Sequence, residues 1–230
     1  MLQQTQAERV IPFYKKFIKQ FPTAKKLAAA PLSQVLRVWQ GLGYNRRAKM
    51  LHQAAQALCV GKFNFPTSVD ELEKLPGVGP YTARAVAAFA RSEDVVFVET
   101  NIRTAVIQHF FPRKKKVSDT EVKKILAQIL PRGKSREWYS ALMDYGAYLK
   151  RSGVSHNAKS RTYAKQAKFA GSFREARGAI VRALAEGPHS LVHLAELLGA
   201  LRRPQMRAAL RALLAERLVK RKGARYALAD

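Results

Sequence analysis

Residues 72–90 read LEKLPGVGPYTARAVAAFA and form the most informative stretch of the chain. A helix is expected to end near Leu75, and a second is expected to begin around Tyr81. Between them, Gly77 and Gly79 permit backbone conformations that other residues rarely adopt, so the link can be a tight hairpin. The bare amides of such a hairpin and the positive end of the following helix together form a clamp for a phosphate group. A plain turn between two helices is the alternative interpretation.

Helical periodicity continues on both sides of this hairpin. The expected helices cover residues 1–20, 31–40, 46–60, 68–74, 80–91, 99–110, 118–130, 134–151, 172–186, 190–199 and 203–216. The β-branched run at residues 94–98 has no partner strand nearby and is expected to be a buried extended link. Residues 218–228 predict two short strands around Lys222 and Gly223. The predicted fold class is therefore all-α with a short β-hairpin at its C-terminal end.

A change of composition predicts the domain boundaries. Residues 151–172 are polar and basic and are typical of a linker or an arm that faces nucleic acid. They separate a first domain, residues 1–150, from a second, residues 173–230. In the second domain three helices precede the hairpin, which is the order of a winged helix. A helical bundle with a trivial hairpin is the alternative.

The third of these helices is the potential recognition helix of the winged-helix interpretation. It carries four arginines that could reach nucleic acid: Arg202, Arg203, Arg207 and Arg211.

The charge of the chain indicates a polyanionic partner. Lys and Arg number 42 against 16 Asp and Glu, and the net charge of +26 divides equally between residues 1–149 and 150–230. Such a surface concentrates polyanions, and nucleic acid is the first partner to consider. A ribosome-associated or merely soluble basic protein is the alternative. The 47% of hydrophobic residues excludes wholesale disorder.

Cysteine content and hydropathy exclude several other classes. Cys59 is the one cysteine of the sequence, so an internal disulfide, an iron–sulfur cluster and a cysteine zinc site are all excluded. Cys59 itself is expected to be buried as a small apolar residue. No apolar run approaches the length of a membrane span, and no signal-peptide pattern opens the sequence. We expect a cytoplasmic, nucleoid-associated protein without a membrane partner.

Three motifs in order resemble one enzyme family. LPGVGPYTA at residues 75–83 resembles the hairpin of the DNA glycosylases of the endonuclease III superfamily. MLQQTQAERVIPFYKKFIKQFPT at residues 1–23 and WQGLGYNRRAKMLHQAA at residues 39–55 are similar to its MutY-type branch, which removes adenine mispaired with oxidised guanine. The resemblance runs from Met1 to about Leu149, and it implies a helix-hairpin-helix glycosylase fold in that part.

The resemblance implies a set of DNA contacts. Such an enzyme extrudes one nucleotide and fills the gap left in the duplex. Gln4 matches the side chain that enters the DNA near the orphaned base, and Tyr44 matches the aromatic wedge; an aromatic packed on the core is the alternative for Tyr44. The full set of expected DNA-contacting residues is Gln3, Gln4, Thr5, Tyr44, Arg46, Arg47, Gly77, Val78, Gly79, Tyr81, Thr82, Asn101 and Arg103.

Glu99 and Tyr81 are the candidate catalytic residues. In VFVETNIRTAV, Glu99 stands where the family has its principal catalytic Asp. Cleavage of an N-glycosidic bond builds positive charge on the sugar, and a nearby carboxylate lowers that barrier. Glu is one methylene longer than Asp, and a misplacement of about 1 Å can reduce a rate strongly. The alternative role of Glu99 is that of an acidic partner for a helix N-terminus.

Departures from the family pattern narrow these expectations. Tyr81 replaces the hairpin Lys of the bifunctional members, so strand cleavage through a Schiff base is not expected. The family's four-cysteine loop should follow WYSALMDYGAYLK at residues 138–150, where this chain has no cysteine. The adenine enzymes hold an acid two residues before MLQQT, which would lie before Met1. We therefore expect that the natural protein continues upstream of Met1.

The function expected from these features is that of a monofunctional DNA glycosylase, acting as a monomer on double-stranded DNA with a mismatched or damaged base. Adenine opposite oxidised guanine or guanine is the first choice of base. A thymine or uracil mismatch glycosylase is the alternative, because Tyr81 resembles those enzymes more closely. A DNA-damage-binding module with impaired catalysis and a winged-helix transcription regulator are the rivals from other classes. No metal or other cofactor is expected, except for a monovalent cation at the hairpin residues 75–79.

Overall fold

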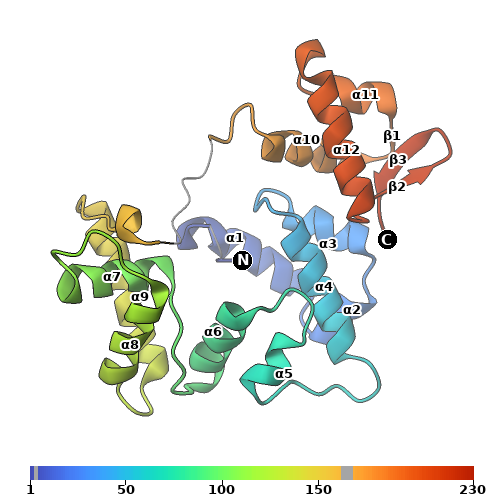
Figure 1. The fold of residues 1–230 in the computed structure, drawn as a ribbon. Helices are drawn as coiled ribbons and strands as arrows, with labels where there is room; N and C mark the ends of the chain where they lie inside the picture. The colour runs from blue at the N-terminus through green and yellow to red at the C-terminus, as the bar shows by residue number, and fades with distance from the viewer. Residues whose placement is uncertain (3–4, 162–167) are drawn as a thin grey trace. The chain divides into compact units, whose positions relative to one another are not determined.

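The computed structural model describes residues 1–2, 5–161 and 168–230, and it is mostly helical (Figure 1). Its contacts divide the chain into two compact units, each with its own hydrophobic core. The first unit consists of Met1–Phe65 and Ala167–Asp230, and the second consists of Pro66–Gln166. No helix among the described residues is long and apolar enough to cross a membrane.

Four helices make up the N-terminal part of the first unit: α1 (Ala7–Gln20), α2 (Ala24–Ala29), α3 (Leu32–Trp39) and α4 (Arg46–Leu58). The predicted helix at residues 1–20 is wrong at its start, because α1 begins at Ala7. Leu2 and Ile11 are 61% and 52% exposed, whereas Val10 of the same segment is buried. The short helix α2 was not predicted, although Thr23 caps it by accepting a hydrogen bond from the Lys26 N–H.

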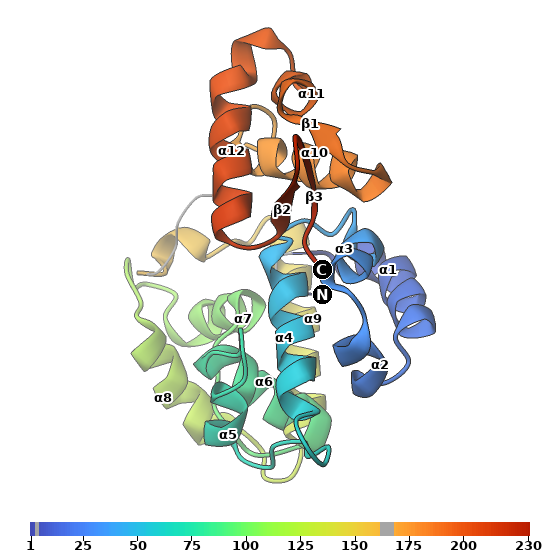
Figure 2. The ribbon, with the colours of Figure 1, turned by 90° about the vertical axis from the view of Figure 1, so that its right-hand side faces the viewer.

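The C-terminal module, which we define as residues 168–230, contains three longer helices and a small sheet. Its elements in order are α10 (Phe173–Glu186), β1 (His189–Ser190), α11 (Leu191–Glu196), η2 (Ala200–Arg202), α12 (Arg203–Ala215), β2 (Val219–Lys222) and β3 (Arg225–Leu228). The predicted hairpin is confirmed as β2 and β3, which lie beside α12 in Figure 2. The prediction omitted a third strand, because β1 has two residues and shows no alternation. The antiparallel sheet has the order β1-β3-β2.

The C-terminal module shares one core with the N-terminal helices. Ile180 of α10 belongs to the same cluster of buried residues as Leu36 and Trp39 of α3. Polar contacts support this packing: the Arg37 side chain donates to the Ala185 carbonyl at 3.0 Å. Buried side chains therefore pack the module onto the N-terminal helices of the first unit.

The second unit contains α5 (Val69–Glu73), α6 (Pro80–Arg91), α7 (Thr100–Phe110), α8 (Asp119–Ile129), α9 (Ser135–Arg151) and the short helix η1 (Asn157–Lys159). The link at residues 94–98 forms no strand; it was expected to be buried, but only Phe97 is, at 1% exposed, whereas Asp94 is exposed. Phe97 packs on Tyr139 of α9 with ring centroids 4.2 Å apart. Asp94 accepts hydrogen bonds from the Ser135 hydroxyl and the Gly133 N–H, so it fixes the start of α9.

Residues 151–161, the described start of the predicted arm, are held against the second unit. Val117 forms an isolated parallel bridge with Ser160, and its N–H donates to the Lys159 carbonyl at 2.8 Å. The two compact units are defined by contacts between residues. The predicted boundaries at residues 150 and 173 instead mark where independently folding domains begin and end. Those boundaries stay a prediction.

Candidate active site

The hairpin at the start of α6 is formed largely by local backbone contacts. Ser68 and Glu71 form a reciprocal cap at the start of α5, and Leu72 anchors that helix in the interior. The Val78 N–H then donates to the Leu75 carbonyl at 3.0 Å, and Gly77 takes a positive φ of 75°. The helix–hairpin–helix predicted from the sequence is therefore present.

Gly79 is the N-cap of α6 and does not need to be a glycine for the fold. Its φ of −100° and ψ of 179° are extended values that any residue adopts. A Cβ added there would meet nothing within 4 Å. The expectation that Gly79 is required for an unusual conformation is thus wrong, and the space beside it is open at a helix N-terminus.

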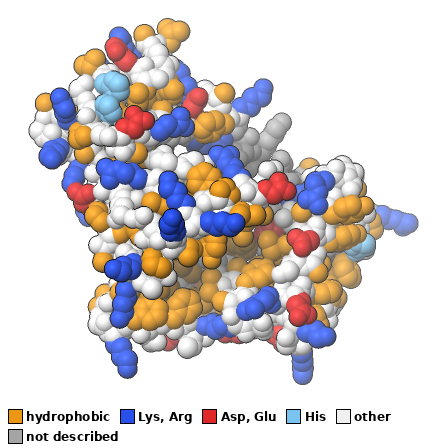
Figure 3. Space-filling model, turned by 180° about the vertical axis from the view of Figure 1, so that it is seen from behind, with side chains coloured by type: hydrophobic (Ala, Val, Ile, Leu, Met, Phe, Trp, Pro, Cys, Tyr) orange, Lys and Arg blue, Asp and Glu red, His pale blue; other side chains and the backbone are white. Residues whose placement is uncertain are grey.

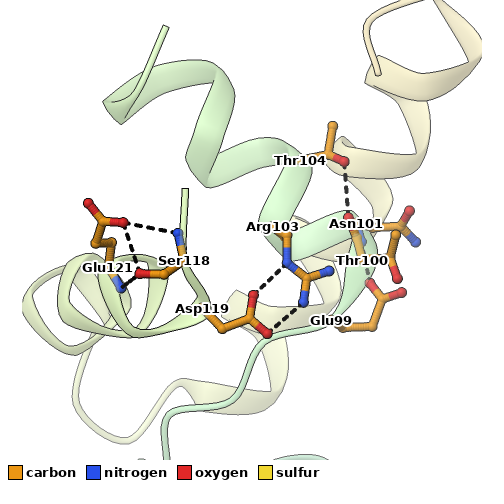
Figure 4. Close-up of polar contacts among 8 residues, drawn as sticks. All are labelled: Glu99, Thr100, Asn101, Arg103, Thr104, Ser118, Asp119 and Glu121. Carbon is orange, nitrogen blue, oxygen red and sulfur yellow. Dashed lines mark hydrogen bonds and ion pairs between the residues drawn. The ribbon is translucent and has the colours of Figure 1, made fainter. Parts of the chain in front are cut away.

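Glu99 is the N-cap of α7, and its carboxylate points back at the first turn of that helix (Figure 4). Its Oε2 accepts a hydrogen bond from the Asn101 N–H at 2.5 Å. Glu99 therefore makes the helix-terminus contact that was the alternative to a catalytic role. The cap also fixes the carboxylate in one place, because it ties the side chain to a rigid backbone.

Asn101 and α9 hold the loop around Glu99. The Lys150 ammonium donates to the Asn101 Oδ1 at 2.6 Å. Gly146 of α9 lies against the Asn101 backbone so closely that a Cβ would be 2.1 Å from the Asn101 carbonyl oxygen. Sequence reasoning missed Lys150 and Gly146, although a glycine in the interior of a helix was an available signal of close packing.

Tyr81 lies in the same unit and senses the charge of Glu99. Its ring packs edge-on against Phe97 at 5.9 Å, and the side chain is 38% exposed. Burial, and secondarily the negative charge of Glu99, raises the pKa of the Tyr81 hydroxyl. Burial also lowers the pKa of Lys150, which Glu99 partly opposes. The structure thus brings both candidate catalytic residues together with a lysine.

Arg103 is committed to an ion pair inside the second unit. Its guanidinium donates twice to Asp119, at 2.8 and 2.9 Å, as drawn in Figure 4. Its side chain is only 14% exposed. Beside this pair, Ser118 and Glu121 form a capping box at the start of α8. Arg103 was expected to contact DNA, and in the structure its guanidinium group joins α7 to α8 through Asp119.

Tyr44 lies in the first unit, between two guanidinium groups. It has a positive φ of 48°, which is uncommon outside glycine, and its side chain is 38% exposed. Arg47 lies 5.5 Å from the ring centroid and Arg174 of α10 lies 5.9 Å from it. Arg174 also donates to the Tyr44 hydroxyl at 3.0 Å. Tyr44 is thus a surface ring held by the C-terminal module and is not a core aromatic.

The other expected DNA contacts divide into exposed and engaged residues. Arg46 is exposed, whereas Arg47 donates to the carbonyls of Met1 and Leu42 and is partly buried. Thr5 lies before α1 in a bend. Gln3 and Gln4 lie outside the described residues. Val78 and Thr82, at the hairpin, are both half-buried.

The donor set does not fit an iron–sulfur cluster. Cys59 lies at the C-cap of α4 and is only half-buried. The expectation that it is buried is therefore wrong. The segment after α9, where the resembled family has its four cysteines, contains none. In their place the Lys116 side chain donates to the Ala158 carbonyl, and Lys159 donates to the Pro112 carbonyl, both at 2.9 Å. Side chain to backbone contacts therefore hold this segment.

Lys and Arg side chains are spread over the face shown in Figure 3, with Asp and Glu side chains between them and hydrophobic side chains beside them.

Relatives identified by sequence are adenine glycosylases. The adenine DNA glycosylase of Mycolicibacterium smegmatis is 42% identical over 149 residues, which are 64% of this chain and 51% of that protein. The adenine DNA glycosylase of Buchnera aphidicola subsp. Baizongia pistaciae is 38% identical over 152 residues, 65% of this chain and 43% of that protein. The chain therefore spans about half the length of these curated relatives.

Solved structures give the same fold. A thermostable thymine-DNA glycosylase matches with a TM-score of 0.57 and 26% identity, over 64% of this chain and 69% of that one. Endonuclease III trapped as a covalent intermediate with DNA matches with a TM-score of 0.53 and 26% identity, over 66% of this chain and 70% of that one. A family model for HhH-GPD superfamily base excision DNA repair proteins matches residues 1–132. Since this match covers more than half of the sequence, the chain belongs to the HhH-GPD superfamily.

Proposed function

We propose that this protein is a monofunctional DNA glycosylase of base excision repair, which hydrolyses the N-glycosidic bond of adenine opposite oxidised guanine or guanine. The observation that carries the proposal is the fixed carboxylate of Glu99, tied to the start of α7 in the same unit as the hairpin. The adenine DNA glycosylases among its relatives support the choice of base.

Glu99 supplies negative charge where the sugar becomes positive. As the bond between base and sugar breaks, a carboxylate stabilises the developing oxocarbenium ion and can orient the attacking water. The N–H of Asn101 holds Glu99 in place, so little reorganisation is needed during the reaction. A tyrosine hydroxyl is protonated near neutral pH, and the pKa of Tyr81 is raised further by burial and by the charge of Glu99, so its hydroxyl can donate a hydrogen bond in the site. Because a phenol replaces the amine at this position, no Schiff base forms there.

DNA is held at the hairpin and opened by Tyr44. The open space beside Gly79 supports close approach of a phosphate to the N-terminus of α6. The exposed ring of Tyr44 can stack in the duplex where the base has left. Gln3, Gln4, Thr5, Arg46, Val78 and Thr82 remain proposed DNA contacts. A monovalent cation bound by hairpin carbonyls at residues 75–79 would strengthen the phosphate clamp.

The remaining assignments follow from the same proposal. The C-terminal module is winged-helix-like, which the order of three helices and a three-stranded sheet supports. The enzyme works as a monomer on double-stranded DNA, without an iron–sulfur cluster, in the cytoplasm near the nucleoid.

Base release from defined duplexes tests the proposal. Labelled duplexes with A opposite oxidised G, A:G, T:G and U:G are incubated with the chain and treated with alkali to cleave abasic sites. We expect release from the two adenine duplexes, and Glu99→Gln should reduce it by roughly 100-fold or more. Glu137→Gln, which changes an exposed glutamate of α9, is the matched control and should release base at the normal rate. Release from no duplex, with Glu99→Gln unchanged, would overturn the enzyme assignment.

A thymine or uracil mismatch glycosylase is the second candidate. The thermostable thymine-DNA glycosylase among the structural matches favours it, as does the tyrosine at position 81. Release from T:G or U:G, but from neither adenine duplex, would select this candidate. Tight binding to mismatched DNA without release from any duplex would instead identify a damage-binding module.

A further inference from the structure

Ion pairs within the C-terminal module occupy some of its cations. Four of its carboxylates each hold one cation, and these pairs are Arg177–Glu216, Arg202–Glu175, Arg203–Glu196 and Lys220–Asp230. Arg202 also donates to Gln205 at 2.6 Å. The two arginines at the start of α12, predicted to belong to the recognition surface, therefore serve contacts within the module.

Five exposed cations on α12 and the β2–β3 hairpin have no carboxylate partner among the described residues. They are Arg207 and Arg211 on α12 and Arg221, Lys222 and Arg225 on the β2–β3 hairpin. The family match ends at residue 132, so it assigns no role to any of them.

Two pairs within this group place like charges next to each other. Arg207 and Arg211 are four residues apart on α12, so they share one face of the helix. Lys222 lies directly opposite Arg225 in the antiparallel ladder. Like charges in either arrangement destabilise the fold. Both pairs would gain from an anion that lies between or beside their charges.

We propose that these two pairs, Arg207 with Arg211 on α12 and Lys222 with Arg225 on the β2–β3 hairpin, bind the phosphate backbone of duplex DNA as a second contact, in addition to the hairpin before α6. An α-helix fits the major groove of B-form DNA, where α12 would lie with its two free arginines on phosphates. The β2–β3 hairpin would contact the backbone beside it. Phosphate contacts position a protein without reading sequence, so both pairs would bind DNA of any sequence.

The salt dependence of binding to an undamaged duplex measures this contact. The full chain and its Arg207→Ala/Arg211→Ala variant are titrated with one B-form duplex over a range of salt concentrations. Each phosphate contact contributes about 0.9 to the slope of log K against log salt, so we expect the slope to fall by about 2. Lys25→Ala/Arg182→Ala removes the same charge from exposed positions on α2 and α10, and it should leave the slope near that of the wild type.

Further variants separate a phosphate contact from a folding defect. Arg207→Lys/Arg211→Lys keeps both charges and should restore the slope, because a lysine also binds phosphate. The Arg207→Ala/Arg211→Ala protein should unfold at the same temperature as the wild type or slightly higher, since a repulsion is removed. An unchanged slope, or a slope equal to that of the control pair, would overturn the proposal.

Two more outcomes bear on the ligand and on the enzyme. A-form RNA has a major groove too deep and narrow for a helix, so the arginine pair should matter less for an RNA duplex. A larger loss on RNA than on DNA would show that DNA is the wrong ligand. Base release plays no part in this experiment, so the second contact can stand or fall independently of the glycosylase activity.

Discussion

The fold does not require a glycine at position 79, whereas the proposed phosphate clamp does. Its backbone is extended and its surroundings are open, so a side chain can be placed there without strain. We predict that Gly79→Ser leaves the free energy of unfolding unchanged or raises it slightly, because Ser is a good N-cap. Affinity for duplex DNA should nevertheless fall, since the new side chain occupies the space that a phosphate would approach. Urea unfolding and a binding titration of the same sample decide the matter, and unchanged affinity would count against the hairpin clamp.

Arg174 positions Tyr44 through a hydrogen bond and a cation–π contact. For the hydrogen bond to the Tyr44 hydroxyl we expect a coupling free energy of about 0.5–1.5 kcal/mol. A double-mutant cycle with Arg174→Ala and Tyr44→Phe, measured by urea unfolding, gives this coupling for the hydroxyl contact. Additive effects of the two substitutions would mean that the hydroxyl of Tyr44 is not held by Arg174 in solution.

At the same scale, the candidate site was only partly predictable from sequence. Glu99 and Tyr81 were identified through motifs, because their neighbours in the chain carry the family pattern. Lys150 was not, since its contact with Asn101 joins positions 49 residues apart. The sequence also did not show which arginines form ion pairs, because the ion pair of Arg103 with Asp119 depends on the packing of α8 beside α7. Contacts of this kind are decided by tertiary structure and leave no local signature.

Among the elements, the packing of α9 on the start of α7 depends on one glycine. A Cβ at Gly146 would overlap the Asn101 backbone, which cannot move without shifting Glu99. We predict that Gly146→Ala lowers the free energy of unfolding by about 1–3 kcal/mol. Gly178→Ala in α10 is the matched control, because a Cβ there meets nothing, and it should stabilise by about 0.5–1 kcal/mol. Chemical unfolding of both variants checks the contrast, and equal effects would contradict the close approach.

The start of α8 predicts a dependence of stability on pH. A hydrogen bond from Lys114, followed by the Ser118 N–H, lowers the pKa of Glu121 from 4.5 to about 2. A lowered carboxyl pKa stabilises the fold above pH 4.5, and this contribution is lost as the pH falls toward 2. Glu121→Gln lacks this contribution, so its stability should fall less steeply between pH 5 and pH 2 than that of the wild type. Unfolding at a series of pH values measures the difference, and parallel curves would contradict the assignment.

Local signals account for most of the elements that the sequence predicted. Helices α5 and α8 begin at Ser–Glu capping boxes that can be seen in the sequence. The predicted start of α1 was wrong because Gln6 forms no side-chain cap that would mark the first turn, and apolar residues before it suggested a longer helix. Strand β1 was not predicted because its two residues form a strand only through pairing with Tyr226 and Arg225. Short elements that depend on a distant partner are the ones that periodicity misses.

At the scale of the molecule, the predicted independence of residues 173–230 can be tested at the core that they share with the N-terminal helices. Ile180 of α10 is fully buried in the cluster that also contains Leu36 of α3. We predict that Ile180→Ala costs about 2–5 kcal/mol and speeds amide hydrogen exchange in both α10 and α3. Leu126→Ala, an equally buried change in the second unit, should speed exchange in α8 and leave α3 protected. If Ile180→Ala leaves amide hydrogen exchange in α3 unchanged, the C-terminal module folds on its own, as the composition of the sequence first indicated. Exchange that rises in α3 and α10 together would show that the module is a structural part of the helices that hold Tyr44.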